Sequence, residues 1–448
     1  MATTRRTIRV LMLPWLAHGH IGPFLELAKK LSKRNFHIFL CSSPVNLSSI
    51  EIPHEYCSTI ELVELHVPSL PGLPPQYHTT RGLPPHLMPK LKTAFDMAGP
   101  NLSDIIADRQ PNLLIFDYLL SWAPEIARSH GIPAVNFSSV AAGMSTYVFH
   151  SIKRPGDEYP FKAIRLQDHW MEKYRNQVEE ASESGMSTTE RVVQCMNHSS
   201  GLIFMKTFRE LEGKYIDYLS DLLGKKVVPV GPLVQDPVQE DGNHIIEWLD
   251  QKERSSTIFV SFGTEYFLTE KEREEIVYGL ELSNVNFIWV VKFPVEEHIN
   301  LEEALPEGFL ERVRDRGRVI EGWAPQARIL AHPSVGGFVS HCGWSSVMES
   351  MKFGVPIIAM PMHLDQPLNA RLVEDIGVGL EVMRNESGEL EREEIAKVIK
   401  AVVVEEGGEC VRNRVKEVSI GIRSKGDEEI DEVEDAIVKL CGVATGSV

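Results

Sequence analysis

Two series of apolar, strand-length runs that alternate with helical segments constrain the fold of this chain more than any other feature. In the first series, IRVLMLP (residues 8–14) precedes IGPFLELAKKLSKR (21–34), whose apolar residues recur with a helical period. NLLIFD (112–117) and PAVNFSS (133–139) repeat the pattern around a shorter helical segment. Strands that are apolar throughout and joined by helices predict a parallel sheet that is covered on both faces.

The second series begins near residue 255 and has the same character. STIFVSFG (256–263) and NFIWVVK (286–292) flank the amphipathic segment EKEREEIVYGLELS (270–283), and VPIIAMP (355–361) is a later apolar run. A chain of 448 residues is also long enough for two domains. We therefore predict an α/β fold with two doubly wound, parallel-sheet domains that face a cleft.

The stretch between the two series is rich in proline, glycine and acidic residues, which is typical of a linker. Residues 66–92 are rich in proline and predict a long loop, and residues 141–195 have an irregular to helical pattern. The end of the chain has the apolar spacing of an amphipathic helix. The predicted boundaries are 1–232 for the first domain, 233–245 for the linker, 246–424 for the second domain and 425–448 for the terminal helix.

Composition narrows the classes of partner. The formal net charge of −17 disfavours a nucleic-acid surface, because the phosphates would be repelled. No apolar run approaches the length of a membrane span, and the run at 8–14 fits a buried first strand better than a signal peptide. The six cysteines form no C-x-x-C pair, which fits reduced thiols. We expect a cytoplasmic monomer without a nucleic-acid partner or an integral membrane segment.

Polar side chains follow two strands of the first series. His18 and His20 lie between the first strand and its helix, and Asp117 ends a later strand. In open α/β sheets, ligands bind beyond the carboxyl ends of the strands. A neutral histidine there can act as a general base, and a carboxylate can orient it. Each residue alone also fits a capping or ion-pairing role, so the pairing of His20 with Asp117 is the more specific hypothesis.

The segment GGFVSHCGWSS (336–346) places small and polar residues at a strand-to-helix turn. N–H groups at a helix start, beside a glycine that allows close approach, suit a phosphate or diphosphate. His341, Ser345 and Ser346 can add donors. The chain has neither a P-loop nor a G-x-G-x-x-G fingerprint after a strand, which disfavours NAD. A metal site is the alternative, although its candidate ligands lack a standard spacing: His332, His341, Cys342 and His363.

Side chains on either side of this turn suit the other parts of a nucleotide sugar. Trp323 precedes a helix and can stack on a base, or alternatively close a hydrophobic core. Gln326 can hydrogen-bond a base or sugar, and Glu349 can hold a ribose diol. Asp365 and Gln366 follow an apolar strand and suit the neighbouring hydroxyls of a hexose. Together these residues predict a nucleotide-sugar site.

The stretch from Trp323 to Gln366, WAPQARILAHPSVGGFVSHCGWSSVMESMKFGVPIIAMPMHLDQ, resembles the signature box of plant family 1 UDP-dependent glycosyltransferases. PWLAHGH, VPVGPL and VSFGTEYF extend the resemblance over nearly the whole chain. Such enzymes have the GT-B fold, in which one Rossmann-like domain mainly binds the acceptor and the other the donor. Their C-terminal helix returns to the first domain. The resemblance implies an inverting transfer from a UDP-sugar to a small molecule, without a metal or other cofactor.

The resemblance also implies roles for individual residues. His20 matches the catalytic base, in preference to His18, and Asp117 matches its carboxylate partner. Uracil stacks on Trp323, and Thr264 approaches the phosphates. The implied donor-binding set is Thr264, Trp323, Ala324, Gln326, His341, Gly343, Trp344, Ser345, Ser346, Glu349, Asp365 and Gln366. Within this set, Gln326 and Glu349 hold the ribose, His341 and Ser346 the phosphates, and Trp344, Asp365 and Gln366 the sugar.

One position departs from the family pattern, because Ser345 stands where most members have asparagine. Trp344 with Asp365 and Gln366 favours UDP-glucose, and UDP-xylose, UDP-rhamnose and UDP-glucuronate are alternatives. WSS, FGTEYF, WLAHGH and LPPHLMP resemble the branch-forming subgroup, which adds a sugar to the sugar of a terpenoid or flavonoid glycoside. The remaining alternatives are transfer directly to an aglycone and a two-lobed binding protein without chemistry.

Overall fold

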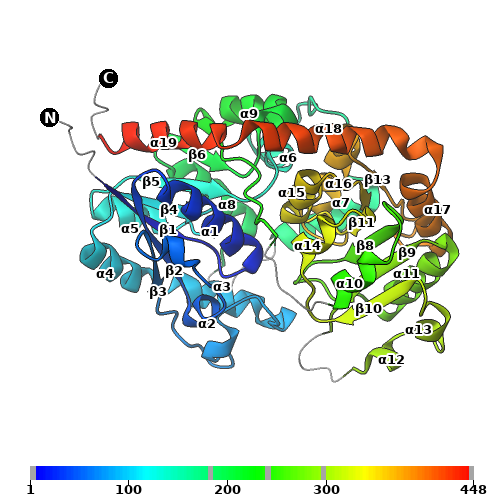
Figure 1. The fold of residues 1–448 in the computed structure, drawn as a ribbon. Coiled ribbons are helices and arrows are strands. Elements are labelled where there is room, and N and C mark those ends of the chain that lie inside the picture. The colour runs from blue at the N-terminus through cyan, green and yellow to red at the C-terminus, as the bar shows by residue number, and fades with distance from the viewer. Residues whose placement is uncertain (1–6, 180–184, 238–243, 294–298, 443–448) are drawn as a thin grey trace. The chain divides into compact units, whose positions relative to one another are not determined.

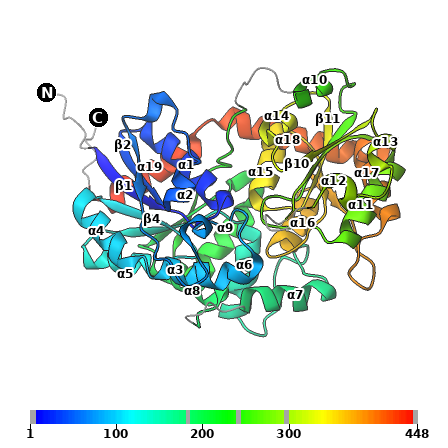
Figure 2. The same ribbon diagram turned by 90° about the horizontal axis from the view of Figure 1, so that it is seen from below.

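The computed structural model describes residues 7–179, 185–237, 244–293 and 299–442. The chain divides into two compact units (Figure 1; Figure 2). Each unit is built around one parallel sheet, so the predicted α/β class with two doubly wound domains is confirmed. The first unit comprises Met1–Tyr159, Asn176–Leu233 and Asp427–Val448, and the second comprises Pro160–Arg175 and Val234–Gly426.

The described residues of the first unit form a seven-stranded sheet of order β3-β2-β1-β4-β5-β6-β7, with parallel neighbours throughout. The chain runs outward in both directions from β1 and β4, so the topological switch point lies between their carboxyl ends. The strands are β1 (Ile8–Leu13), β2 (Phe36–Ser42), β3 (Ile60–Glu64), β4 (Leu113–Asp117), β5 (Ala134–Ser138), β6 (Leu202–Met205) and β7 (Lys226–Pro229).

Helices cover both faces of this sheet, and alternate residues of β1 enter the two cores. Val10 and Met12 pack with residues of α1 and α19, whereas Leu11 and Leu13 pack with residues of α3, α4 and α5. The helices are α1 (His18–Ser32), α2 (Pro44–Leu47), α3 (Met88–Asp96), α4 (Gly99–Arg109), α5 (Ala123–Ser129), α6 (Ala142–Lys153), α8 (Thr188–His198), α9 (Arg209–Leu223) and α19 (Glu428–Leu440).

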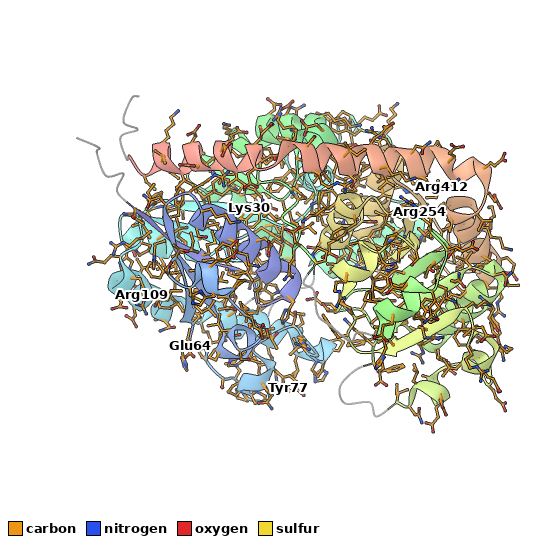
Figure 3. The ribbon with its side chains drawn as sticks, in the orientation of Figure 1. Lys30, Glu64, Tyr77, Arg109, Arg254 and Arg412 are labelled. Carbon is orange, nitrogen blue, oxygen red and sulfur yellow. The ribbon has the colours of Figure 1, made fainter. Side chains whose placement is uncertain are left out.

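The last helix of the chain, α19, belongs to the first unit, where it lies beside α1 (Figure 1; Figure 2). Lys30 of α1, labelled in Figure 3, donates to the Asp427 carboxylate, and Arg34 donates to Asp431 at 2.7 Å. The apolar side of α19, including Ile437, is buried in the same core as β1. Both apolar burial and ion pairs therefore fix this helix to the first sheet.

Three segments refine or change the sequence expectations. Residues 66–87 form the long loop predicted for 66–92, in which prolines start the 3₁₀ turns η2 (Pro75–Tyr77) and η3 (Pro85–Leu87), and α3 begins at Met88. Within 141–195 lie α6, α7 (Asp168–Glu179) and α8. Residues 160–175, which we assigned to the first domain, group with the second unit. Of the predicted linker, residues 238–243 lie outside the described residues.

The second unit holds a six-stranded sheet among its described residues, of order β10-β9-β8-β11-β12-β13 and again parallel throughout. Its switch point lies between β8 and β11. The strands are β8 (Thr257–Ser261), β9 (Asn286–Val291), β10 (Gly317–Glu321), β11 (Val335–Ser340), β12 (Ile357–Ala359) and β13 (Gly379–Glu381).

Alternate residues of β8 enter two cores in this unit as well. Ile258 and Val260 pack with residues of α11 and α17, and Phe259 packs with residues of α10 and α14. No helix among the described residues combines the length and the apolar character that crossing a membrane requires. Besides part of α7, the helices of this unit are α10 (His244–Asp250), α11 (Glu270–Ser283), α12 (Leu301–Ala304), α13 (Phe309–Arg312), α14 (Gln326–Leu330), α15 (Trp344–Phe353), α16 (Gln366–Asp375), α17 (Arg392–Val403) and α18 (Glu409–Lys425).

Candidate active site

A histidine and a carboxylate meet at the switch point of the first sheet. Asp117 is fully buried at the end of β4, and its Oδ2 lies 2.8 Å from Nδ1 of His20 in the first turn of α1. The structure therefore pairs His20, rather than His18, with Asp117. An ionised carboxylate only accepts hydrogen bonds, so Nδ1 carries the hydrogen and Nε2 is the basic nitrogen of the ring. With 18% of its side chain exposed, His20 can reach a substrate.

Two further contacts that sequence reasoning missed hold this turn. The ring of His20 stacks on Tyr118, with centroids 5.3 Å apart and an interplanar angle of 26°. The carbonyl of Leu16, just before α1, accepts a hydrogen bond of 3.0 Å from the N–H of Thr80. The position of Tyr118 directly after Asp117 was a usable signal, whereas the link to Thr80 depends on the path of the proline-rich segment.

The turn at the end of β11 prepares the start of α15. Cys342 has a positive φ of 64°, its N–H donates to Ser340 Oγ at 3.1 Å, and its carbonyl accepts from Asn369 Nδ2 at 2.9 Å. Gly343 is the N-cap residue, and α15 starts without a side-chain cap. The first N–H groups of a helix have no acceptor within the helix, so this turn presents donors that suit an anion.

His341 fills the space between two glycines at this turn. A Cβ on Gly263 would lie 2.7 Å from His341 Nε2, and a Cβ on Gly343 would lie 2.6 Å from the same atom. Burial, and then the neighbouring His363 and Lys292, lower the pKa of His341 to about 3. His341 is therefore neutral at pH 7 and can donate one ring N–H without adding charge.

The residues predicted at the nucleoside end lie in one unit, and two of them are in contact. Gln326 Nε2 donates to the Glu349 carboxylate, which brings the predicted ribose pair together. Trp323 is 67% exposed, so the alternative that it closes a hydrophobic core is wrong. The next residue, Ala324, is buried in the core that α14 shares with β8. Thr264 is exposed on the turn after β8.

Not all of the predicted sugar contacts point outward. Trp344 is only 3% exposed, while Ser345 is half-buried and Ser346 is buried. Gln366 is 4% exposed, and its Oε1 accepts from the N–H groups of Met362 and His363 at 3.0 and 3.1 Å. Gln366 therefore shapes the loop before α16, a role that sequence reasoning missed. Its contact with the sugar, and that of Trp344, stay predictions.

The loop before α16 is held from several directions. Asp365 Oδ2 accepts from Asn369 at 2.7 Å. Lys173 of α7 donates to the Met362 carbonyl at 2.8 Å, and Arg384 donates to the Pro361 carbonyl at 3.0 Å. The guanidinium of Arg384 also lies 5.3 Å from the ring centroid of Trp170 in α7. Residues 160–175 thus contact the loop at the predicted sugar end of the site. No local sequence pattern predicted this contact.

Among the described residues, the candidate ligands of the alternative metal site do not form a ligand set. In the part of the chain that the structure describes, no three or more His, Cys, Asp or Glu side chains gather as metal ligands would. His332, one member of that alternative, instead contacts Ser334 Oγ at 2.8 Å and Asp250 Oδ1 at 3.1 Å.

Comparisons with known proteins identify the family of this chain. The family model UDP-glucoronosyl and UDP-glucosyl transferase matches residues 164–411, and the model of a glycosyltransferase N-terminal domain matches residues 6–235. The chain belongs to the plant family 1 UDP-glycosyltransferases. UDP-glucosyltransferase 29 of Panax ginseng is 53% identical over 97% of both chains.

Two other relatives of this UDP-glycosyltransferase are informative. The beta-D-glucosyl crocetin beta-1,6-glucosyltransferase of Gardenia jasminoides is 50% identical over 97% of this chain and 100% of that one. The crystal structure of a Glycyrrhiza uralensis glycosyltransferase, UGT73P12, with glycyrrhetinic acid 3-O-monoglucuronide is 25% identical, covers 98% and 96% of the two chains and has a TM-score of 0.84. The GT-B fold implied by the sequence is thereby confirmed.

Proposed function

We propose that this UDP-glycosyltransferase moves glucose from UDP-glucose, with inversion, to a hydroxyl on the sugar of a small-molecule glycoside. The observation that carries the reaction type is the 2.8 Å contact between His20 and the buried Asp117. The Gardenia relative, whose name describes the extension of a glucosyl group, supports a glycoside as the acceptor. The Trp344, Asp365 and Gln366 pattern supports UDP-glucose as the donor.

In the proposed reaction, Nε2 of His20 takes the proton of the acceptor hydroxyl while the hydroxyl oxygen attacks the anomeric carbon. The bond from that carbon to the β-phosphate oxygen breaks, and its electron pair leaves with UDP. Asp117 holds the Nδ1–H tautomer of His20 and stabilises the imidazolium that forms. General base catalysis of this kind contributes roughly 10²–10⁴-fold to the rate.

The second unit would stabilise the leaving group. The start of α15 offers backbone N–H groups, and Ser345 and Ser346 add hydroxyls in its first turn. Donors fixed in place before the reaction stabilise developing charge without reorganisation. We propose that this turn binds the diphosphate of UDP as the bond to the sugar breaks, and that the transfer needs no added metal.

The test offers UDP-glucose together with matched pairs of an aglycone and its monoglucoside. We expect transfer to the monoglucoside, with a new sugar–sugar linkage visible by NMR and one added hexose by mass spectrometry. Parallel reactions with UDP-xylose, UDP-rhamnose and UDP-glucuronate are expected to be slower. Transfer to free aglycones alone would overturn the proposed acceptor class, and a faster reaction with another UDP-sugar would overturn the proposed donor.

We also propose that the enzyme works as a monomer in the cytosol. The six cysteines at 41, 57, 195, 342, 410 and 441 are free, which supports a reducing compartment.

A further inference from the structure

A lysine at the carboxyl edge of the second sheet lies beside the predicted diphosphate turn. Lys292 directly follows β9, which pairs with β8 so that Val290 lies opposite Ser261. The two strands therefore end side by side, and the Lys292 ammonium donates to the Gly263 carbonyl at 2.9 Å. Gly263 lies on the turn after β8, next to Thr264.

Gly263 connects this lysine to His341. The Cβ position of Gly263 lies 2.7 Å from His341 Nε2, so the turn that binds the Lys292 ammonium packs directly against the imidazole. Lys292 also acts on the pKa of His341, which it helps to lower. Lys292, Gly263 and His341 thus form one contiguous group, and Gly343 at the start of α15 also packs against the imidazole, because its Cβ position lies 2.6 Å from Nε2.

The charge of this group matters because the other donors at the turn are neutral. His341 is uncharged at pH 7, and the remaining donors are hydroxyls and backbone N–H groups. Around the neighbouring His363, Glu265 and Asp365 add negative charge and Lys173 adds positive charge, since all three act on the pKa of that ring. A diphosphate brings further negative charge to the same place, and a charge-assisted hydrogen bond is roughly twice as strong as a neutral one.

We propose that the Lys292 ammonium contacts the diphosphate of the donor and neutralises the charge that builds up as UDP leaves. This inference rests on the proposed function, in which the turn from His341 to Ser346 holds UDP. As the bond between the anomeric carbon and the β-phosphate oxygen breaks, the oxygen gains the electron pair, and Lys292 stabilises it. The acceptor proton still goes to His20.

The experiment compares the binding of UDP and of uridine by calorimetry, in EDTA so that no stray metal supplies positive charge. In the wild type we expect UDP to bind more tightly than uridine. Lys292→Met should weaken UDP at least ~10-fold, because a charge-assisted contact is lost, and change uridine less than ~2-fold. Lys292→Gln, which keeps an N–H donor for the Gly263 carbonyl, should behave like Lys292→Met, and Lys292→Arg should keep most of the UDP affinity.

Lys252 provides the matched control. Its ammonium also donates to a backbone carbonyl at 2.9 Å, that of Asp315. Asp315 lies just before β10, and so at the amino end of that strand in the same sheet. Lys252→Met should leave the affinities for both UDP and uridine unchanged. In transfer assays, Lys292→Met should also lower kcat at saturating donor, because the contact strengthens as charge develops.

The outcomes separate this inference from the function on which it rests. A wild type that binds neither UDP nor uridine would contradict the proposed function. A wild type that prefers UDP, with a UDP-to-uridine ratio unchanged in Lys292→Gln, would show that Lys292 only holds the Gly263 turn. If Lys292→Met does not fold, Lys292→Gln and Lys292→Arg test the same point. Weaker UDP binding in Lys292→Gln than in Lys292→Arg would support the contact, and equal UDP binding would contradict it.

Discussion

The switch points of the two sheets have the same topology, but the histidine at each one has different neighbours. In the first unit, the turn after β1 supplies His20 and the end of β4 supplies Asp117. In the second unit, the turn after β8 supplies Gly263, and His341 follows β11. The histidine of the first sheet faces a carboxylate, and that of the second sheet faces glycines.

This difference determines what each imidazole can do. The Asp117 carboxylate accepts from Nδ1 of His20 and leaves Nε2 to serve as the proposed proton acceptor. Burial, with His363 and Lys292 nearby, lowers the pKa of His341 and keeps its ring neutral. The same strand-to-helix geometry therefore suits the proposed base where a carboxylate lies across the switch point, and the proposed anion site where glycines and a lysine lie there.

The largest expected effect comes from removing the proposed base, His20. His20→Ala should lower kcat roughly 10²–10⁴-fold, because the acceptor hydroxyl loses its proton acceptor, while UDP affinity stays within about 2-fold. Asp117→Asn should also lower kcat strongly, because an amide can donate to Nδ1 and so favour the wrong tautomer. Steady-state kinetics with calorimetric UDP binding measures both quantities.

His18→Ala is the control for this prediction, since His18 lies in the same turn of α1 but the structure pairs His20 with Asp117. It should retain most of the turnover. Wild-type turnover in His20→Ala, or a larger loss in His18→Ala, would move the base to His18.

The comparison also shows what the sequence could predict. His20 and Asp117 were recognisable because apolar parallel strands place their carboxyl ends along one edge, whichever way the helices pack. Gln366 was placed in the correct loop, but its inward hydrogen bonds to Met362 and His363 depend on the path of that loop. The contact of Lys173 with the Met362 carbonyl joins residues 189 positions apart, so no local pattern contains it.

A smaller effect is expected from filling the space beside His341. Gly343 has an ordinary φ of −56°, so alanine fits its backbone, but the new Cβ would lie 2.6 Å from His341 Nε2. The imidazole must shift, and Gly343→Ala should weaken UDP binding and lower turnover by up to about 100-fold. UDP calorimetry and initial rates measure the change.

Gly19→Ala is the matched change at the first turn, where a Cβ would meet no atom within 4 Å. It should leave UDP affinity and turnover near wild type. Equal losses in both variants would mean that backbone flexibility, rather than the packing of His341, explains the glycines.

The smallest effect concerns stability in acid. The pKa of His341 is about 3 in the folded protein and near 6.5 when unfolded, so between these values the unfolded chain binds more protons. His341 therefore lowers the stability of the second unit as the pH falls from about 6.5 toward 3. His341→Gln cannot take up that proton, so its Tm should fall less than that of the wild type between pH 7.5 and pH 5, by roughly 4–8 °C. His244→Gln, at a side chain 96% exposed in the same unit, should keep the wild-type slope. If His341→Gln has the wild-type slope instead, His341 takes up its proton in the folded state, and the contrast between the two switch points would no longer be one of charge.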